Sequence, residues 1–284
     1  MAGASTGLRT FEGAVALVTG GASGIGAALG RGLAARGALV VLADRDGEGA
    51  RAEAGRIGEK GGRAEAATLD VRDAGAVDAL VADLLGRHRR LDYIFNNAGI
   101  GVGGAVRDLG LDDWREAVEV DLMGVVHGVR AAWPRMIDQG FGHVVNTASA
   151  AAFLSGAMSA PYGATKNAVV ALSRALRVEG ALHGVRVSVV CPGVVRTAIL
   201  EDGGRYGRLH HIDSVTLAAM WERLRPMNAD VFARKTLDDV ARNRAVIVHP
   251  AWWRAVRFLN SVAPSLLDAL ARRELARLRA QHRP

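Results

Sequence analysis

Short apolar segments alternate with longer segments of helical periodicity along this 284-residue chain. The apolar segments indicate strands at 14–20, 38–46, 93–99, 142–149, 185–193 and 245–250. Because these segments are apolar almost throughout, they favour strands that are buried on both faces, as in a parallel sheet. The segments between them, such as GIGAALGRGLAARG and AGAVDALVADLLGRH, have apolar residues at helical spacing. The pattern predicts an α/β fold with a single doubly wound parallel sheet flanked by helices.

The alternation continues without an internal repeat or a low-complexity linker, which favours one domain over residues 1–250. Residues 251–284 then form a basic, amphipathic C-terminal extension. A predicted helix in it places Leu267, Ala271, Leu275 and Leu278 on one face, with arginines elsewhere. Two interpretations stay open for this extension: peripheral contact with an anionic membrane, or packing on the substrate pocket or on a neighbouring subunit.

Composition narrows the class of protein. Half of the residues are hydrophobic, yet no apolar run approaches the roughly 18–20 residues that span a bilayer. The first residues lack the apolar core of a signal peptide. Cys191 is the single cysteine, which excludes an internal disulfide, and we interpret it as a packing residue. We therefore expect a cytoplasmic protein, with membrane association as the alternative that the extension raises.

The net charge of +7 raises the question of nucleic acid. The arginines are scattered through residues 1–245 rather than gathered in a basic block with aromatic residues. We therefore predict no nucleic-acid partner.

A glycine-rich segment at 19–26 follows the first predicted strand and precedes the first predicted helix. Its glycines allow a tight turn and a close approach of the backbone to a ligand, and the helix N-terminus can hold a pyrophosphate. Asp44 lies eighteen residues beyond Gly26, at the end of the second strand. An acid there accepts hydrogen bonds from an adenosine ribose and repels a 2′-phosphate, which favours NAD over NADP. Arg45 would soften this preference, and the alternative for Asp44 is a cap or turn residue.

Tyr162 and Lys166 lie four residues apart at the start of a predicted helix, so their side chains are neighbours on one face. A free phenol has a pKa of about 10, too high for a base at neutral pH. A cation one helical turn away stabilises the phenolate and lowers this pKa, which favours proton transfer. The alternative is a surface tyrosine beside a solvated lysine.

Ser149 lies thirteen residues before Tyr162, at the end of a predicted strand. A hydroxyl there can donate a hydrogen bond to a carbonyl oxygen as negative charge develops on it. Alone, such a serine is usually a cap or turn residue. The Gly-x-Ser-x-Gly pattern is absent around it, so serine-hydrolase chemistry is not indicated.

Together these motifs resemble the short-chain dehydrogenase/reductase family over about residues 13–250. TGGASGIG at 19–26 is similar to the family's dinucleotide loop, and LDV at 69–71 to its adenine-contacting segment. NNAG at 96–99 is similar to the segment along the adenine and ribose, and PGVVRT at 192–197 to the segment at the nicotinamide. The resemblance implies a Rossmann-type fold, NAD with NADP less favoured, and a homodimer or homotetramer.

The resemblance also implies the site. The cofactor-binding residues would be Thr19, Gly20, Ser23, Gly24, Ile25, Gly26, Asp44, Arg45, Asp70, Val71, Asn97, Ala98, Gly99, Tyr162, Lys166, Pro192, Gly193, Val195 and Thr197. The catalytic residues would be Ser149, Tyr162, Lys166 and Asp121. Tyr162 would pass a proton to or from the substrate oxygen, and Lys166 would tune Tyr162 and hold the nicotinamide ribose.

Asp121 departs from the family pattern, which usually has an asparagine that supports a water beside the lysine. An ionised Asp121 would support the charge of Lys166 and raise the pKa of Tyr162, whereas a protonated one would donate as an amide does. If only the backbone carbonyl holds the water, the side chain hardly matters. The further alternative is that Asp121 faces elsewhere and pairs with an arginine.

The family's substrate-covering loop corresponds to about 198–236, where Leu200, Met220 and Trp221 suggest an apolar cover. The alternative is a pair of helices packed on the sheet. His210 and His211 would belong to this loop, and we expect no metal site there because adjacent histidines point apart. His127 is interpreted as a packing or interface residue.

The sequence thus predicts an NAD-dependent oxidoreductase that interconverts a secondary alcohol and a ketone on an apolar small molecule. The alternative from another class is a dinucleotide-binding sensor or scaffold with little turnover.

Overall fold

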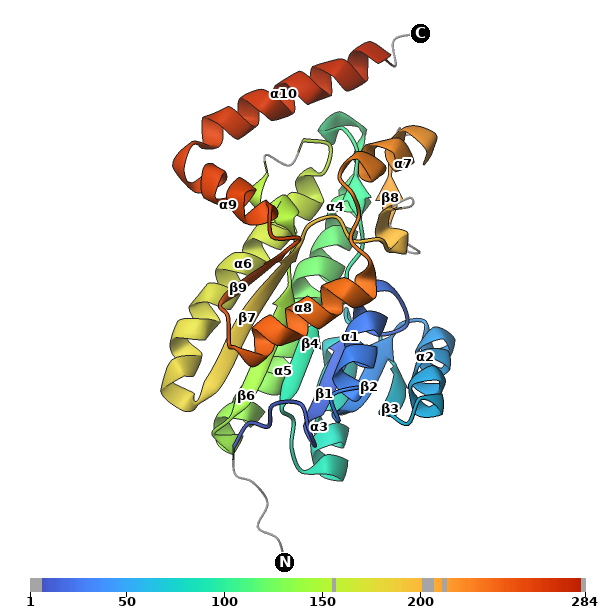
Figure 1. Cartoon of the computed structure of the whole chain (residues 1–284), viewed down its shortest axis with the longest axis vertical. Helices are drawn as coiled ribbons and strands as arrows, with labels where there is room; N and C mark the ends of the chain where they lie inside the picture. Colours follow the sequence, from blue (N-terminus) through green and yellow to red (C-terminus); the bar gives the residue numbers. More distant parts are fainter. Residues whose placement is uncertain (1–6, 155–156, 201–206, 211–213, 282–284) are drawn as a thin grey trace, which may run out of the picture.

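A seven-stranded parallel sheet forms the centre of the computed structural model, which describes residues 7–154, 157–200, 207–210 and 214–281 (Figure 1). Its strands are β1 (Val15–Thr19), β2 (Leu39–Asp44), β3 (Arg63–Thr68), β4 (Tyr93–Asn96), β6 (Gly142–Thr147), β7 (Val185–Pro192) and β9 (Val246–His249). Their order is β3-β2-β1-β4-β6-β7-β9, so the winding reverses between β1 and β4. In such sheets ligands bind beyond the carboxyl ends of the strands at this reversal. The predicted α/β doubly wound fold is confirmed.

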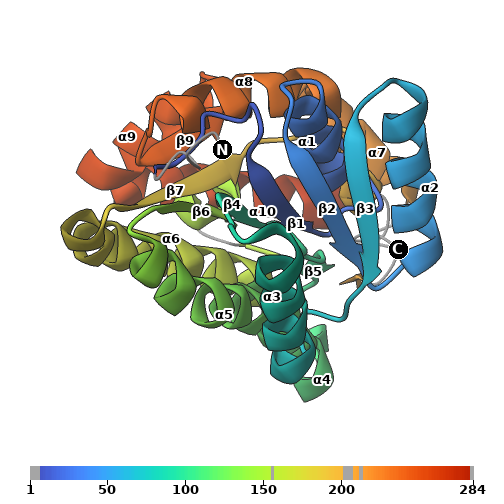
Figure 2. The same ribbon diagram turned by 90° about the horizontal axis from the view of Figure 1, so that it is seen from below.

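Helices cover both faces of the sheet (Figure 2). They are α1 (Gly24–Ala34), α2 (Gly47–Glu59), α3 (Ala74–His88), α4 (Leu111–Val118), α5 (Gly124–Gln139), α6 (Ala160–Gly180), α7 (Ser214–Arg223), α8 (Ala229–Ala241), α9 (Trp253–Val262) and α10 (Pro264–Gln281). Apolar side chains of α3, α5 and α6 pack in the core on one face, and those of α1, α2 and α8 in the core on the other. None of the described helices is long and apolar enough to cross a membrane.

β3 was missing from the strands that the sequence indicated. Its sequence RAEAAT contains two charged residues and no large apolar residue, and its ends are exposed. As the edge strand of the sheet it pairs only with β2, so it does not need the continuous apolar character of its neighbours. Strand formation here follows from pairing in register with β2 rather than from burial.

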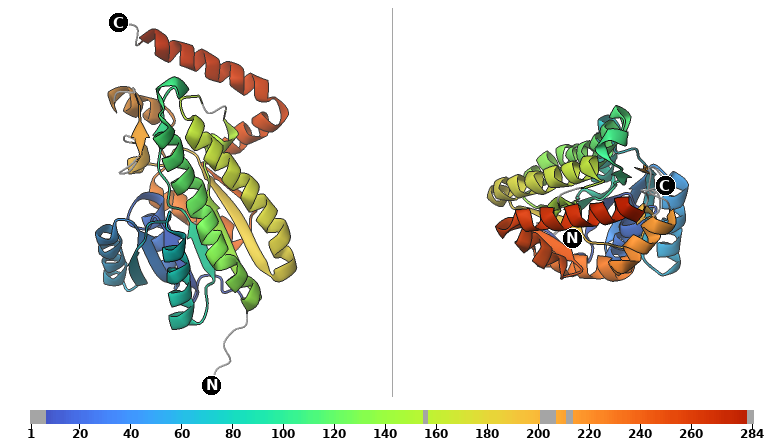
Figure 3. Two further views of the ribbon diagram at one scale, coloured as in Figure 1. Left: turned by 180° about the vertical axis from the view of Figure 1, so that it is seen from behind. Right: turned by 90° about the horizontal axis from the view of Figure 1, so that it is seen from above.

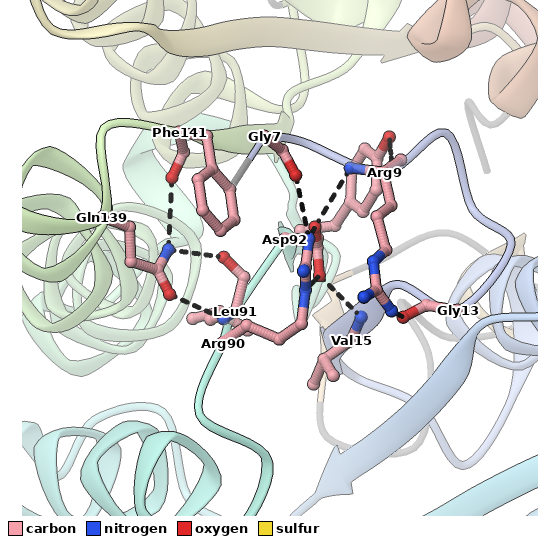
Figure 4. Close-up of polar contacts among 10 residues, drawn as sticks. Gly7, Arg9, Gly13, Val15, Arg90, Leu91, Asp92, Gln139 and Phe141 are labelled. Carbon is pink, nitrogen blue, oxygen red and sulfur yellow. Dashed lines mark hydrogen bonds and ion pairs between the residues drawn. The ribbon is translucent and has the colours of Figure 1, made fainter. Parts of the chain in front are cut away.

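The amino edge of the sheet, opposite the ligand edge, is organised around the buried carboxylate of Asp92 (Figure 4). It accepts hydrogen bonds from the backbone N–H of Arg9 at 3.2 Å and of Val15 at 2.9 Å. The Nε of Arg90 donates to the same carboxylate at 2.7 Å. These bonds hold the N-terminal segment and the start of β1 to the chain just before β4.

Part of the predicted substrate loop belongs to the main fold. Residues 229–236 lie in α8, where Phe232 and Ala233 are buried and the helix packs against α1. For this end of the range the structure matches the alternative of a helix packed on the main fold, because an apolar face of α8 packs in the core. The remaining described parts contain the short helix η5 (Ala198–Leu200), the two-residue strand β8 (Arg208–Leu209) and α7.

The C-terminal extension forms α9 and α10. We call residues 251–281 the C-terminal arm. α9 packs against β9 and against the short helix η3 (Ala150–Phe153), whereas α10 packs mainly against α9. α10 lies beyond the carboxyl edge of the sheet, on the same end of the molecule as α4 and α7 (Figures 1 and 3).

Candidate active site

The glycine-rich loop between β1 and α1 has the tight geometry that the sequence indicated. Gly20 and Gly24 have positive φ angles of 68° and 54°, which side chains disfavour. A Cβ at Gly26 would lie 1.9 Å from the carbonyl oxygen of Gly20. One at Gly24 would lie 3.1 Å from Cγ2 of Thr197. The loop therefore brings α1 close to β1 and approaches the segment after β7.

The N-terminus of α1 points its first amide groups toward this loop. Its N-cap residue is Ser23, whose backbone is extended and whose side chain makes no capping hydrogen bond. The first amides of a helix have no partner within the helix, so they are available to an anion. This arrangement of glycines and helix start could hold a pyrophosphate, and Ser23, Ile25 and Gly26 lie at the helix start.

Asp44 ends β2 beside this loop. Its Oδ2 accepts a hydrogen bond from the N–H of Ala22 at 3.0 Å, and its Oδ1 accepts one from the N–H of Asp46 at 2.9 Å. Both the turn role and the ribose role considered from the sequence are therefore compatible with its position, since each carboxylate oxygen has a second lone pair. Arg45 follows at the exposed end of the strand.

Thr19 fastens the loop after β4 to the end of β1. Its hydroxyl accepts hydrogen bonds from the N–H of Asn97 at 2.9 Å and of Ala98 at 3.1 Å. The side chain of Asn97 donates to the Thr19 carbonyl at 3.0 Å. Thr19 and Asn97 thus fix the backbone of the 96–99 segment at the point where the sheet reverses.

Asp70 and Val71 lie beyond β3. The carboxylate of Asp70 forms an ion pair with Arg72, so its side chain shapes its own turn. The Nδ1 of His127, from α5, donates to the Val71 carbonyl at 2.8 Å. His127 is thus a residue that anchors this loop, in agreement with the packing interpretation.

Ser149, Tyr162 and Lys166 converge beside these loops. Ser149 follows β6, and its Oγ accepts from the N–H of Ala151 at 3.1 Å while also hydrogen-bonding to Tyr162. The Nζ of Lys166 lies 5.4 Å from the centre of the Tyr162 ring, and the lysine is 3% exposed. The spacing of four residues on α6 places the two side chains together, as expected.

The pKa of Tyr162 is raised above its usual value. Burial is the largest cause, and Asp121 adds to it. Lys166 and the hydrogen bond with Ser149 lower the pKa, as the sequence suggested for the lysine, but burial outweighs them. Sequence spacing reveals the cation but not the extent of burial.

Asp121 lies inside the same cluster. It belongs to a π-helical turn, Glu119–Met123, that joins α4 to α5, and such turns are frequent at functional sites. Its Oδ1 lies 3.5 Å from Nζ of Lys166 and accepts from the N–H of Ile100 at 2.9 Å. Its side chain is fully buried, and Oδ2 has no hydrogen-bond partner in the described residues. Burial raises the pKa of Asp121, while Lys166 lowers it.

The segment from Pro192 to Thr197 leaves the end of β7 toward the glycine-rich loop. Trp253 of α9 lies against it: a Cβ at Gly193 would be 2.2 Å from the indole nitrogen of Trp253, which is 6% exposed. Val195 is also buried. The neighbouring Cys191 is buried, which raises the pKa of its thiol to about 12 and agrees with a packing role.

No motif in the sequence associates Trp253 with this segment. A tryptophan in a C-terminal extension carries no local signal of the strand on which it packs, so only the tertiary structure reveals the contact.

The described part of the predicted substrate loop contacts α4 through a hydrogen bond. β8 pairs with β5 (Val102–Gly103), and Nε2 of His210 lies 3.0 Å from Oδ1 of Asp113. Leu200 and Trp221 pack on the main core, and Met220 is half-buried. His211 lies outside the described residues. In the portion of the chain that the structure covers, no three His, Cys, Asp or Glu side chains gather to hold a metal ion.

Comparison with known proteins identifies the same family that the sequence motifs indicated. The short chain dehydrogenase family model matches residues 14–205, which is well over half of the chain. The chain therefore belongs to the short-chain dehydrogenase/reductase family of oxidoreductases, and the resemblance in its motifs is confirmed.

Two similar proteins are dehydrogenases by name. The meso-2,3-butanediol dehydrogenase of Serratia marcescens is 38% identical over 187 residues, which cover 66% of this chain and 73% of the relative. The D-threitol dehydrogenase of Mycolicibacterium smegmatis is 35% identical over 223 residues, which cover 74% and 86%.

A solved structure is also similar. A short-chain dehydrogenase/reductase from Burkholderia phymatum, crystallised in complex with NAD, superposes with a TM-score of 0.78 at 33% identity. The match covers 88% of this chain and 93% of that one.

Proposed function

We propose that this protein is an NAD-dependent oxidoreductase that interconverts a secondary alcohol and a ketone on an apolar small molecule. The observation that carries the proposal is the convergence of Ser149, Tyr162 and Lys166 beside a glycine-rich loop at the reversal point of the sheet. The diol and polyol dehydrogenases among the relatives, and the NAD complex of the Burkholderia protein, support the reaction class and the cofactor.

The residues of the chain fit NAD. The amides at the start of α1 would hold the pyrophosphate, with Gly20, Gly24 and Gly26 allowing its close approach. Asp44 would accept from the adenosine ribose, which disfavours a 2′-phosphate. The loops at Asp70–Val71 and Asn97–Gly99 would line the adenosine half. The segment at Pro192–Thr197 would contact the nicotinamide half.

When bound, NAD supplies the acceptor or donor of a hydride at the substrate carbon. Tyr162 takes the proton from the alcohol oxygen in oxidation and returns it to the ketone oxygen in reduction. Ser149 hydrogen-bonds the same oxygen and stabilises charge that develops on it. Lys166 favours the phenolate form of Tyr162, counteracting burial, and would hold the nicotinamide ribose.

Asp121 acts through Lys166 in this proposal. Its carboxylate lies beside the lysine, so an ionised Asp121 supports the lysine's charge and raises the pKa of Tyr162. The unpartnered Oδ2 is a polar atom at which a water or a proton would be stabilised.

The apolar nature of the substrate rests on Leu200, Met220 and Trp221 in the covering segments. The exposed Val178 of α6 is compatible with a homodimer or homotetramer, which light scattering would test. A cytoplasmic location stays a prediction based on the use of a single cysteine.

The test is Tyr162→Phe, which keeps the ring but removes the proton. We expect kcat to fall by about 100-fold or more with a panel of secondary alcohols, while NAD binding by calorimetry changes little. Turnover by the Tyr162→Phe variant close to that of the unchanged protein would contradict the catalytic assignment. Binding of NAD with no turnover by the unchanged protein on any alcohol or ketone would favour a sensor.

A further inference from the structure

The C-terminal arm exposes large apolar side chains on both of its helices. Phe258 and Val262 lie one turn apart in α9, and Leu266 and Leu270 lie one turn apart in α10. Trp252 precedes α9. These five side chains are between 47 and 68% exposed. The two pairs lie on either side of the junction at Ala263–Pro264, so the exposed apolar side chains follow one another along the arm.

Basic residues accompany this surface. Residues 249–284 contain seven arginines against Asp268 and Glu274, a formal charge of +5 (7 − 2). Arg254 and Arg257 are directed toward the body, near Asp239 and over the ring of Phe153. Arg272 and Arg273, further along α10, are exposed. A helix pair with an apolar surface, tryptophan and excess arginine has the composition of an interfacial membrane anchor.

We propose that the C-terminal arm docks this protein on the surface of an anionic lipid bilayer. The apolar side chains of α9 and α10 would enter the headgroup boundary, and the arginines would face the anionic lipids. The described helices include none that could span the bilayer, so the contact is peripheral. This inference does not depend on the proposed function.

Charge favours a bilayer over a second copy of the chain. A two-fold interface would place the same surface on both sides, and the exposed Arg272 and Arg273 of both arms would then add like charges to one interface. An anionic bilayer instead complements the arm. α10 also packs mainly against α9 and lies clear of the sheet, so that an extended flat partner has access to it (Figures 1 and 3).

The position of the C-terminal arm determines how the docked protein would be oriented on the bilayer. α10 lies beyond the carboxyl edge of the sheet, the same end as the candidate active site (Figure 1). Docking through the arm would therefore turn the substrate end of the molecule toward the bilayer, where apolar alcohols and ketones partition.

The test is co-sedimentation of the purified full-length protein with vesicles. We expect binding to phosphatidylcholine vesicles that contain phosphatidylglycerol, little binding to phosphatidylcholine alone, and loss of binding at high salt. Phe258→Glu/Leu270→Glu should lower the partition coefficient at least about tenfold. Arg272→Gln/Arg273→Gln should lower it by about fivefold per charge removed, on anionic vesicles.

Leu182→Glu is the matched control, because it places the same charge on an 85% exposed leucine just past the end of α6. It should leave vesicle binding unchanged. Failure of the full-length protein to sediment with anionic vesicles would overturn the proposal. So would unchanged binding by the arm variants, or a fall in their solution mass without any vesicle binding, which would identify a second copy as the partner. Because partition requires no turnover, its outcome is independent of whether the oxidoreductase assignment holds.

Discussion

Asp121 places a second titratable side chain against Lys166, 3.5 Å from its Nζ, in a fully buried setting. A negative charge there disfavours the phenolate of Tyr162 and adds to the effect of burial. Asp121→Asn removes that charge while keeping an acceptor for the Ile100 N–H. We therefore expect the apparent pKa assigned to Tyr162 in the pH profile of kcat/KM to move downward, with substrate preference unchanged. Superimposable profiles for the two proteins would show that Asp121 does not act on Tyr162.

Asp44 combines a loop role with its proposed cofactor role. Asp44→Ala should weaken NAD and raise the ratio of kcat/KM for NADP to that for NAD by about tenfold, since the repelling carboxylate and its ribose hydrogen bond are lost. Kinetics with both cofactors measure this ratio. The control is Asp46→Ala, which removes the N-cap of α2 but leaves Asp44 in place. An equal change in the control would mean that loop distortion, and not the ribose, sets the preference.

These two residues show what could be predicted at the site. The position of Asp44 was predicted from its spacing to the glycine-rich loop, and that of Asp121 was implied by the resemblance to the family. The hydrogen bonds from Ala22, Asp46 and Ile100 did not, because they depend on backbone geometry between segments far apart in the chain. Burial, which decides the direction of the pKa of Tyr162, is likewise a property of the assembled fold.

A buried histidine links two neighbouring strands of the sheet, β6 and β7. The Nε2 of His143 in β6 lies 2.9 Å from Oγ of Ser188 in β7, which itself donates to the Arg244 carbonyl. Burial, reinforced by two nearby arginines, lowers the pKa of His143 to about 3. An unfolded chain therefore binds a proton below pH 6.5 that the folded protein excludes.

The contribution of neutral His143 to the free energy of unfolding is therefore present above pH 6.5 and is lost as the pH falls toward 3. From pH 6.5 to pH 4 this loss amounts to about 3 kcal/mol. His143→Gln can still donate to Ser188 but does not titrate, so its free energy of unfolding should fall less over this range. Urea denaturation at a series of pH values measures the difference. Parallel curves for the two proteins would contradict the assignment.

Apolar periodicity identified the buried strands but not β3 or the start of α8. β3 is held by pairing with β2 at the sheet edge, so its composition carries little signal. At the start of α8 the charged residues Asp230 and Arg234 obscure the face that carries Phe232 and Leu237. An element of this kind is recognisable only against the helix on which it packs, here α1.

At the scale of the whole molecule, the C-terminal arm has two parts with different roles. Trp253 packs on Gly193, so α9 supports the segment that is proposed to contact the nicotinamide, whereas α10 packs mainly against α9. Ending the chain after Ala263 should leave Tm and turnover close to those of the full chain. Ending it after Pro250 should lower the free energy of unfolding by about 3–5 kcal/mol, as for loss of a buried tryptophan, and weaken NAD binding.

Thermal unfolding and calorimetry with NAD would compare these two truncated chains. Trp253→Ala in the full chain is the matched variant, since it removes the buried ring and keeps both helices. If the two truncations lower Tm equally, the contact between Trp253 and Gly193 contributes little, and the division of the arm into two parts is wrong.

The contact between Trp253 and Gly193 also has an optical consequence. Trp253 packs on the segment proposed to hold the nicotinamide, and the ring of Trp252 stacks on that of Trp253 with centroids 4.4 Å apart. One of the five tryptophans of the chain therefore contacts this segment and a second lies next to it. Indole emission overlaps the absorption band of a reduced nicotinamide, and energy transfer between them is strong at short range. Titration with NADH should therefore quench the protein's ultraviolet emission and excite the blue emission of the nucleotide. The tryptophan emission would therefore report the fraction of the protein that has cofactor bound, before any substrate is known.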